Sequence, residues 1–173
     1  MAAVRYVEQG TCDASHAHEP VALGADAAAG YAEGALVERF VVTADGAASD
    51  ALDRDRLTAW LAGHDPDTGT MRGRNNVAEN SAMVYDATVN LPKSFSIAAI
   101  LDEDLRVGLS VLQDKIRDHS MSVWAEELYV RRGTDGGRRV SLAQVEVAEL
   151  RHERSRSLDP HIHRHMWLNA RAR

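Results

Sequence analysis

The clearest periodic pattern in this chain lies in residues 102–127, where apolar side chains recur every three or four positions. That spacing predicts one long helix with a candidate break near His119; its apolar face would carry Leu105, Leu109, Leu112, Ile116 and Trp124. Residues 53–63 repeat the pattern over a shorter length, with Asp53 as N-cap and Gly63 as a stop. Pro92 suits a first helical turn, so another helix is expected from about residue 94. Residues 26–40 form a weaker helix prediction, because glycines interrupt them.

Other segments alternate in the manner of strands. Residues 83–90, 128–132, 145–152 and 161–169 are predicted to form an antiparallel sheet, with the long helix packed on one face. A Gly-rich hairpin at 133–137 separates 128–132 from a strand beginning near residue 140. Residues 71–81 are polar and predict a loop. The expected fold is α+β, and 173 residues suit one domain.

Composition limits the possible functions. The mixture, 45% hydrophobic and 27% charged, is that of a globular protein. A single cysteine allows no internal disulfide and fits a cytoplasmic location. No apolar run is long enough for a membrane helix and no secretory signal is evident. The net charge of −6 argues against nucleic acid, yet residues 131–173 hold ten arginines and only five acidic residues.

Histidines carry the main chemical signal. On a strand, His161, His163 and His165 would all point from one face, and neutral imidazole is a common ligand for divalent metals. His152 ends the preceding predicted strand and could fold back to meet them. A solvent-facing stripe of histidines would be the better interpretation of an isolated repeat. Neighbouring apolar residues and three nearby arginines favour a metal site with an anionic substrate.

The longer segment 152–165 is more specific. It reads His-Glu-Arg-Ser-Arg-Ser-Leu-Asp-Pro-His-Ile-His-Arg-His. It resembles the three-histidine motif of conjugative relaxases of the TrwC/TraI (MobF) type, in the HUH endonuclease superfamily. The resemblance implies that His152, His163 and His165 are the metal ligands and that His161 is an extra histidine.

Two other segments carry the same resemblance. Residues 86–96 read Asp-Ala-Thr-Val-Asn-Leu-Pro-Lys-Ser-Phe-Ser, similar to a family segment whose aspartate reaches the metal site. Asp86 inherits that role, orienting a ligand histidine or taking a tyrosine proton. Residues 61–69 resemble the family pattern Leu-x-Gly-x-Asp-Pro-x-Thr-Gly. The matched core covers residues 53–171, whereas residues 1–50 match poorly. The implied fold has a central antiparallel sheet with helices on one side.

The chain departs from the family at its nucleophile. Relaxases of this type carry tyrosines near the N-terminus, often in pairs, and this chain has no Tyr-Tyr sequence. The candidates are Tyr6 and Tyr31, and a surface position is the ordinary interpretation for the one that is not the nucleophile, or for both. Because the family domain continues beyond the metal strand, a fragment or a degenerate gene product is expected.

The resemblance implies nicking of single-stranded DNA at a transfer origin, through a covalent 5′-phosphotyrosine, to begin conjugative plasmid transfer. Accessory relaxosome and coupling proteins would be further partners. The family implies Mg²⁺ or Mn²⁺, while three histidines would also suit Zn²⁺, Co²⁺ or Ni²⁺. The candidate contacts to the DNA backbone are basic residues near the motifs: Lys93, Arg154, Arg156 and Arg164.

Two alternatives stay open on the sequence. One is an inactive relaxase fragment that binds metal or single-stranded DNA without nicking. The other is an unrelated enzyme with a His-x-His metal site, such as a cupin-like enzyme. The Pro-Lys-Ser segment and the spacing of eleven positions from His152 to His163 argue against the second.

Overall fold

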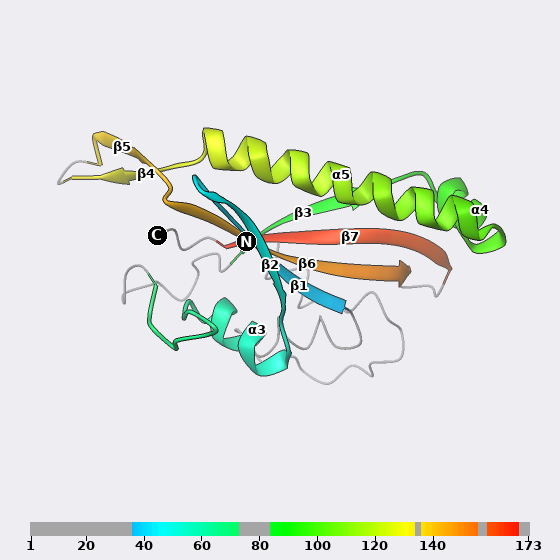
Figure 1. Ribbon diagram of the computed structural model, residues 1–173, viewed down its shortest axis with the longest axis horizontal. Helices are drawn as coiled ribbons and strands as arrows, with labels where there is room; N and C mark the ends of the chain where they lie inside the picture. Colours follow the sequence, from blue (N-terminus) through cyan, green and yellow to red (C-terminus); the bar gives the residue numbers. More distant parts are fainter. Residues whose placement is uncertain (1–35, 73–83, 134–135, 156–158, 170–173) are drawn as a thin grey trace.

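A computed structural model describes residues 36–72, 84–133, 136–155 and 159–169. Figure 1 shows a sheet with helices on both sides. The described elements, in chain order, are β1 (Leu36–Thr43), β2 (Gly46–Ala51), α3 (Arg54–Leu61), β3 (Val84–Asn90), α4 (Lys93–Leu101), α5 (Glu103–Glu127), β4 (Tyr129–Arg132), β5 (Arg138–Ser141), β6 (Gln144–Arg154) and β7 (Pro160–Asn169).

The main sheet has five strands in the order β2-β1-β6-β7-β3, and every neighbouring pair is antiparallel. The two longest strands, β6 and β7, lie side by side near its centre. A short connection between them lets their residues pair directly, whereas β3 joins the edge from far away in the sequence. The predicted α+β fold with a central antiparallel sheet is confirmed.

Side-chain alternation along β6 and β7 builds two apolar layers. On one face, Ala148, Leu150 and Trp167 pack with α3, chiefly through Leu57 and Trp60. On the other face, a second cluster lies under α5; it contains Val89, Met121, Val145, Val147 and Met166. The helices that follow β3 therefore cover one face as expected, and α3 covers the other (Figure 1).

The helix starts follow local capping chemistry. The Asp53 side chain accepts a hydrogen bond from the backbone of Arg56, as its predicted N-cap role requires. The Asp102 side chain caps α5 by accepting hydrogen bonds from the backbone N–H groups of Asp104 and Leu105. The helix α5 runs unbroken past His119. Its buried stripe differs from the predicted one. Leu105 and Leu112 are exposed, and polar side chains take inner positions at Gln113 and Arg117.

Two sequence predictions need correction. Residues 36–40, expected at the end of a helix, belong to β1, because extended backbone pairs them with both β2 and β6. The predicted strand at 128–132 does not join the main sheet. It forms β4, which pairs only with β5 in a separate two-stranded ribbon. Residues 26–35 and 73–81 of the other predictions lie outside the described residues.

Among the described residues, none of the helices has both the length and the apolar character needed to cross a bilayer.

Candidate metal centre

Histidine side chains gather where β6 ends and β7 begins. The antiparallel register places His152 directly opposite His163. The ring centroid of His152 lies 5.3 Å from those of both His163 and His165, and the last two are 5.1 Å apart. The His161 ring lies 4.7 Å from that of His163. The structure therefore brings together the three ligands expected from the motif.

The cluster continues the apolar layer under α3. Because alternate residues of β7 face the same side, His163 and His165 share a face with Trp167, and Leu150 and His152 do so on β6. His163 is 4% exposed and His165 only 2%. Burial of this kind excludes a solvent-facing stripe and gives the two rings a low-dielectric surrounding.

Asp86 on the edge strand reaches this face. Its carboxylate oxygens lie 2.9 and 3.1 Å from Nδ1 of His165. The hydroxyl of Thr88 lies 3.4 Å from the same nitrogen. β3 pairs with β7 so that Thr88 is opposite His165. The tertiary structure thus places the predicted carboxylate against one of the predicted ligands.

These contacts assign the proton positions of two rings. A carboxylate only accepts, so His165 donates its Nδ1–H to Asp86. Nδ1 of His163 lies 2.7 Å from the backbone oxygen of His161, which also only accepts. In the neutral form of either ring, Nε2 then carries the lone pair. Ligand histidines in metal sites commonly have this second hydrogen bond.

The donor set and spacing fit a divalent metal ion. Imidazole nitrogens bonded about 2.1 Å from one ion at near-tetrahedral angles would separate the ring centroids by roughly 5 Å. The measured separations agree with this value. Within the described ranges, no three His, Cys, Asp or Glu side chains already form a finished ligand set. Binding would therefore require the rings to turn so that their Nε2 atoms meet.

Arg164 is a correction to the predicted DNA contacts. It lies between two histidines in sequence, so its side chain points to the opposite face of β7. The residue is 3% exposed, and Nη1 donates to Asp114 at 2.6 Å and to Glu149 at 2.9 Å. Nη2 donates to Ser110. Because these contacts occupy the guanidinium, Arg164 joins α5 to the sheet and is not placed to hold DNA.

A buried charge cluster surrounds this arginine. Glu149 is fully buried and also accepts from Arg151 at 2.7 Å and from Arg117 at 3.5 Å. Burial raises the pKa of the Asp114 carboxyl, but the hydrogen bond and charge of Arg164, with the charges of Arg117 and Arg151, outweigh it and leave that pKa below its ordinary value. Sequence patterns missed this cluster, because its members come from distant elements.

Two other predicted DNA contacts, Lys93 and Arg154, lie near the connection between β6 and β7. Lys93 begins α4 and pairs with Asp159 at 2.7 Å; its side chain is half exposed. Arg154 ends β6 and is exposed. Arg156 and both candidate nucleophiles, Tyr6 and Tyr31, lie outside the described residues.

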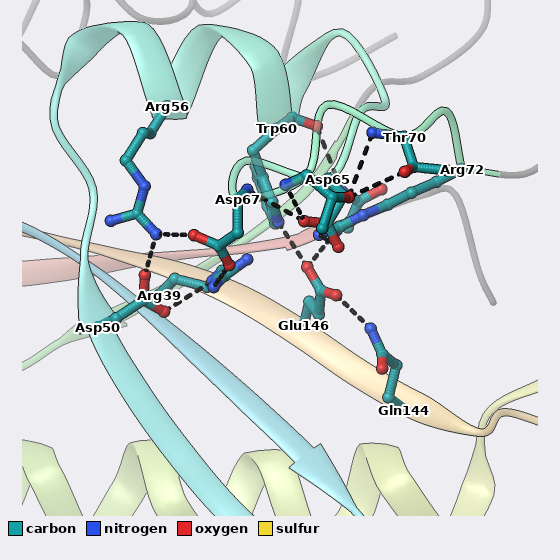
Figure 2. Close-up of polar contacts among 12 residues, drawn as sticks. Arg39, Asp50, Arg56, Trp60, Asp65, Asp67, Thr70, Arg72, Gln144 and Glu146 are labelled. Atoms are coloured by element: carbon teal, nitrogen blue, oxygen red, sulfur yellow. Dashed lines mark hydrogen bonds and ion pairs between the residues drawn. The ribbon is translucent and has the colours of Figure 1, made fainter.

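The third sequence motif, residues 61–69, forms the loop after α3 (Figure 2). Asp65 closes it, since its carboxylate accepts from the backbone N–H groups of Asp67 and Thr68, both at 3.0 Å. Its own N–H donates to the carbonyl of Thr70. Gly69 has φ +68°, a left-handed conformation that favours glycine. The motif therefore specifies a tight turn.

Buried ion pairs fix this turn to the sheet (Figure 2). Glu146 on β6 accepts from the indole N–H of Trp60 at 2.8 Å and pairs with Arg72, which is 2% exposed. Arg72 also reaches Asp65 at 3.4 Å. Glu146, Leu150 and His152 share a face of β6, so the turn and the histidines lie toward opposite ends of one surface. The role of the turn is structural.

A second ion-pair group lies nearer solvent. Asp67 accepts from Arg39 at 2.7 Å and also pairs with Arg56, and both arginines reach Asp50 (Figure 2). The hydrogen bond from Arg39 is the main reason that the pKa of the Asp67 carboxyl lies below its ordinary value; burial opposes it and Arg56 adds to it. These pairs connect β1 and β2 with the loop after α3.

Comparison with known proteins points the same way. A family model described as TrwC relaxase matches residues 2–173. A search of curated proteins finds no match.

Three solved structures illustrate the similarity in fold. The conjugative relaxase TrwC in complex with OriT DNA, in a metal-free structure, gives a TM-score of 0.64 at 24% identity, covering 84% of this chain and 52% of that one. A metal-bound TrwC–OriT DNA complex gives 0.60 at 22% identity, with 78% and 47% covered. TrwC with a 27-mer DNA comprising the recognition hairpin and cleavage site gives 0.61 at 23% identity, with 77% and 48% covered. The chain thus spans about half the length of these structures.

Proposed function

Because this chain belongs to the TrwC relaxase family, we propose that it acts in nicking one strand of DNA at a transfer origin, the step that begins conjugative plasmid transfer. The observation that carries the proposal is the packed cluster of His152, His163 and His165, with Asp86 holding Nδ1 of His165. Family membership also removes the alternative of an unrelated His-x-His enzyme.

The proposed reaction is a transesterification. A tyrosine hydroxyl attacks the scissile phosphodiester, and the new bond joins its oxygen to phosphorus. The bond from phosphorus to the 3′ oxygen breaks, so the products are a 5′-phosphotyrosine and a free 3′-hydroxyl. The tyrosine proton leaves, and a proton is taken up by the departing oxygen. Tyr6 and Tyr31 are the candidates for this nucleophile.

The three histidines would hold a divalent ion whose chemistry is to polarise the scissile phosphate and stabilise charge on its oxygens. Asp86 keeps His165 in the tautomer that presents Nε2. Mg²⁺ or Mn²⁺ follows from the family, whereas an all-nitrogen donor set suits Mn²⁺, Zn²⁺, Co²⁺ or Ni²⁺ better than Mg²⁺. Lys93, Arg154 and Arg156 are proposed to contact the DNA backbone.

A nicking assay tests the activity. Purified protein is mixed with a labelled origin oligonucleotide and Mn²⁺, then resolved on a denaturing gel. We expect a shortened 3′-hydroxyl product and a slower-moving covalent protein–DNA adduct. Both products should be lost in the variant that removes the nucleophile, which is Tyr6→Phe or Tyr31→Phe. If the whole protein containing this chain gives neither product with any of the divalent metals, the nicking proposal fails. Retained DNA binding in that case would identify the inactive alternative.

Metal binding is tested without activity. Calorimetric titration with Mn²⁺ or Zn²⁺ should show about one ion per chain, and a His163→Ala/His165→Ala variant should lose it. His161→Ala is the matched control, because the resemblance makes this histidine an extra one. The metal affinity of this variant should stay within a few fold of that of the parent. Unchanged affinity in the double variant would refute the ligand assignment.

The partners and compartment belong to the same proposal. Single-stranded DNA is the substrate, and accessory relaxosome and coupling proteins would join it at the origin. The cytoplasm is the proposed location, because the plasmid DNA is processed there.

A further inference from the structure

We propose that the ribbon of β4 and β5 binds the phosphate backbone of DNA at a place separate from the histidine cluster. This inference rests on the proposed function. The arginine ribbon is defined here by the four arginines of these two strands, Arg131, Arg132, Arg138 and Arg139. All four are exposed.

The ribbon carries an unusual pairing of like charges. Arg131 lies directly opposite Arg139, and Arg132 directly opposite Arg138. Like charges facing each other across two strands destabilise the pairing. The ribbon forms no part of the main sheet, and among the described residues none of its members belongs to either buried core cluster, so core burial does not compensate for this repulsion. An anion bound between the guanidinium groups would relieve it.

These arginines differ from most of the other arginines that the structure describes. Arg39, Arg56, Arg117 and Arg164 each contact two or more carboxylates. In the part of the chain that the structure describes, no ion pair involves any arginine of the ribbon. The overall charge is −6, so carboxylates are plentiful. Four exposed arginines that form no ion pair with any described carboxylate make a local cationic surface on an acidic protein.

One face of the ribbon is also ordered for binding. The guanidinium of Arg139 lies over the ring of Tyr129, 4.4 Å from its centroid. Arg131, opposite Arg139, shares this face, and its side chain lies beside Gly136 at the turn. Stacking on an aromatic ring holds a guanidinium in place while its N–H groups stay directed outward. This arrangement favours a phosphate-rich polymer over a single small anion.

Position separates this surface from the histidines. The ribbon leads into the start of β6, whereas His152 lies near the end of that strand (Figure 1). Eight residues of extended chain span about 26 Å. A DNA strand held by both sites would therefore be anchored several nucleotides from the reacting phosphate, and the ribbon would contribute affinity without touching the chemistry.

The test measures DNA affinity against salt. The probe is a fluorescein-labelled single-stranded 30-mer of mixed sequence, titrated by anisotropy between about 50 and 200 mM NaCl. The variant Arg131→Gln/Arg139→Gln removes one facing pair. We expect roughly tenfold weaker binding at the lowest salt and a slope of log affinity against log salt smaller by about 1.4 for two lost phosphate contacts. Its thermal midpoint should be equal or higher, because repulsion is removed.

The matched control is Arg106→Gln/Lys115→Gln, which removes the same charge from exposed positions of α5. It should change affinity by less than about twofold. If the ribbon variant binds as the parent does, with the same slope, the ribbon proposal is overturned and the nicking proposal stands. An equal loss in both double variants would show only an effect of net charge and would overturn the ribbon as a site. If the parent protein binds no DNA, both proposals fail together.

Discussion

At the scale of single residues, the contact between Asp86 and His165 does the most for the proposed chemistry. The carboxylate accepts a hydrogen bond from the Nδ1–H of His165 and so determines which nitrogen of the ring is available as a ligand. Both groups come from strands far apart in the sequence, and the β3–β7 register sets their distance. One hydrogen bond therefore joins the edge of the sheet to the candidate metal centre.

Replacing Asp86 with Asn should weaken metal binding by about 10- to 100-fold, because the amide no longer supports the same tautomer and basicity of His165. Calorimetric titration with Mn²⁺ or Zn²⁺ measures the change. Thr88→Val removes only the longer contact to the same nitrogen and serves as control. Equal affinities in the Asp86 variant and the parent would remove Asp86 from the site.

Arg164 shows how a residue inside a functional motif can have a structural role. Substitution by Leu should lower the free energy of unfolding by about 3 kcal/mol, since it leaves the buried Glu149 with weaker compensation. Urea unfolding measures this. Arg154→Leu, at the exposed end of β6, should cost less than about 1 kcal/mol. A small effect at Arg164 would contradict the assignment of its side chain to the α5–sheet contact.

At the scale of elements, stability and position come from packing. α3 has only eight residues, too few to be stable alone in water, and Leu57, Trp60 and Leu61 hold it against the sheet. The Asp53 cap and the turn after α3 then determine where the loop that follows this helix contacts β1 and β2. β4 shows the opposite case. It pairs with β5, the next strand along the chain, and the two form a ribbon outside the main sheet.

The N-cap of α3 gives a prediction at this scale. Asp53→Ala should destabilise the protein by about 1 kcal/mol, because the backbone N–H of Arg56 loses its acceptor. Asp55→Ala is the comparison and should cost less, because Asp55 lies in the first turn and the cap of α3 is Asp53. Chemical denaturation measures both. Equal losses would mean that the effect is one of charge near the helix start and not of capping.

At the scale of the whole molecule, ion pairs connect each outer layer to the sheet. Asp67 joins the loop after α3 to β1, and Asp114 joins α5 to β7. The pKa of each carboxyl is lowered below its ordinary value of 3.8. The folded state therefore binds fewer protons than the unfolded state. The resulting stability is present above about pH 4 and is lost as the pH falls through the lowered folded values.

Acid unfolding tests this linkage. The thermal midpoint should fall steeply below about pH 4, and Asp67→Asn or Asp114→Asn should flatten that fall while lowering the midpoint at neutral pH. Asp104→Asn, an exposed change outside both groups, should leave the profile parallel to that of the parent. Parallel profiles in all three variants would show that other groups dominate the acid response.

The sequence by itself determined whatever depends on neighbouring residues. Periodicity located α5, β3, β6 and β7, because 3.6- and 2-residue repeats are written along the chain. Capping chemistry located the start of α3. The motif residues also selected His152, His163, His165 and Asp86, which the structure places together.

Only the tertiary structure decided features that join distant segments. β1 and β2 carry weak local patterns and are strands because β6 pairs with β1, and β1 in turn pairs with β2. The two-residue period of a strand turns Arg164 to the face opposite the histidines, but no sequence period could show that it pairs there with Glu149 and Asp114, since that contact depends on how α5 lies across the sheet. The physical reason is common to both cases. Local conformation follows from the covalent chain, whereas burial and ion pairing follow from which surfaces meet.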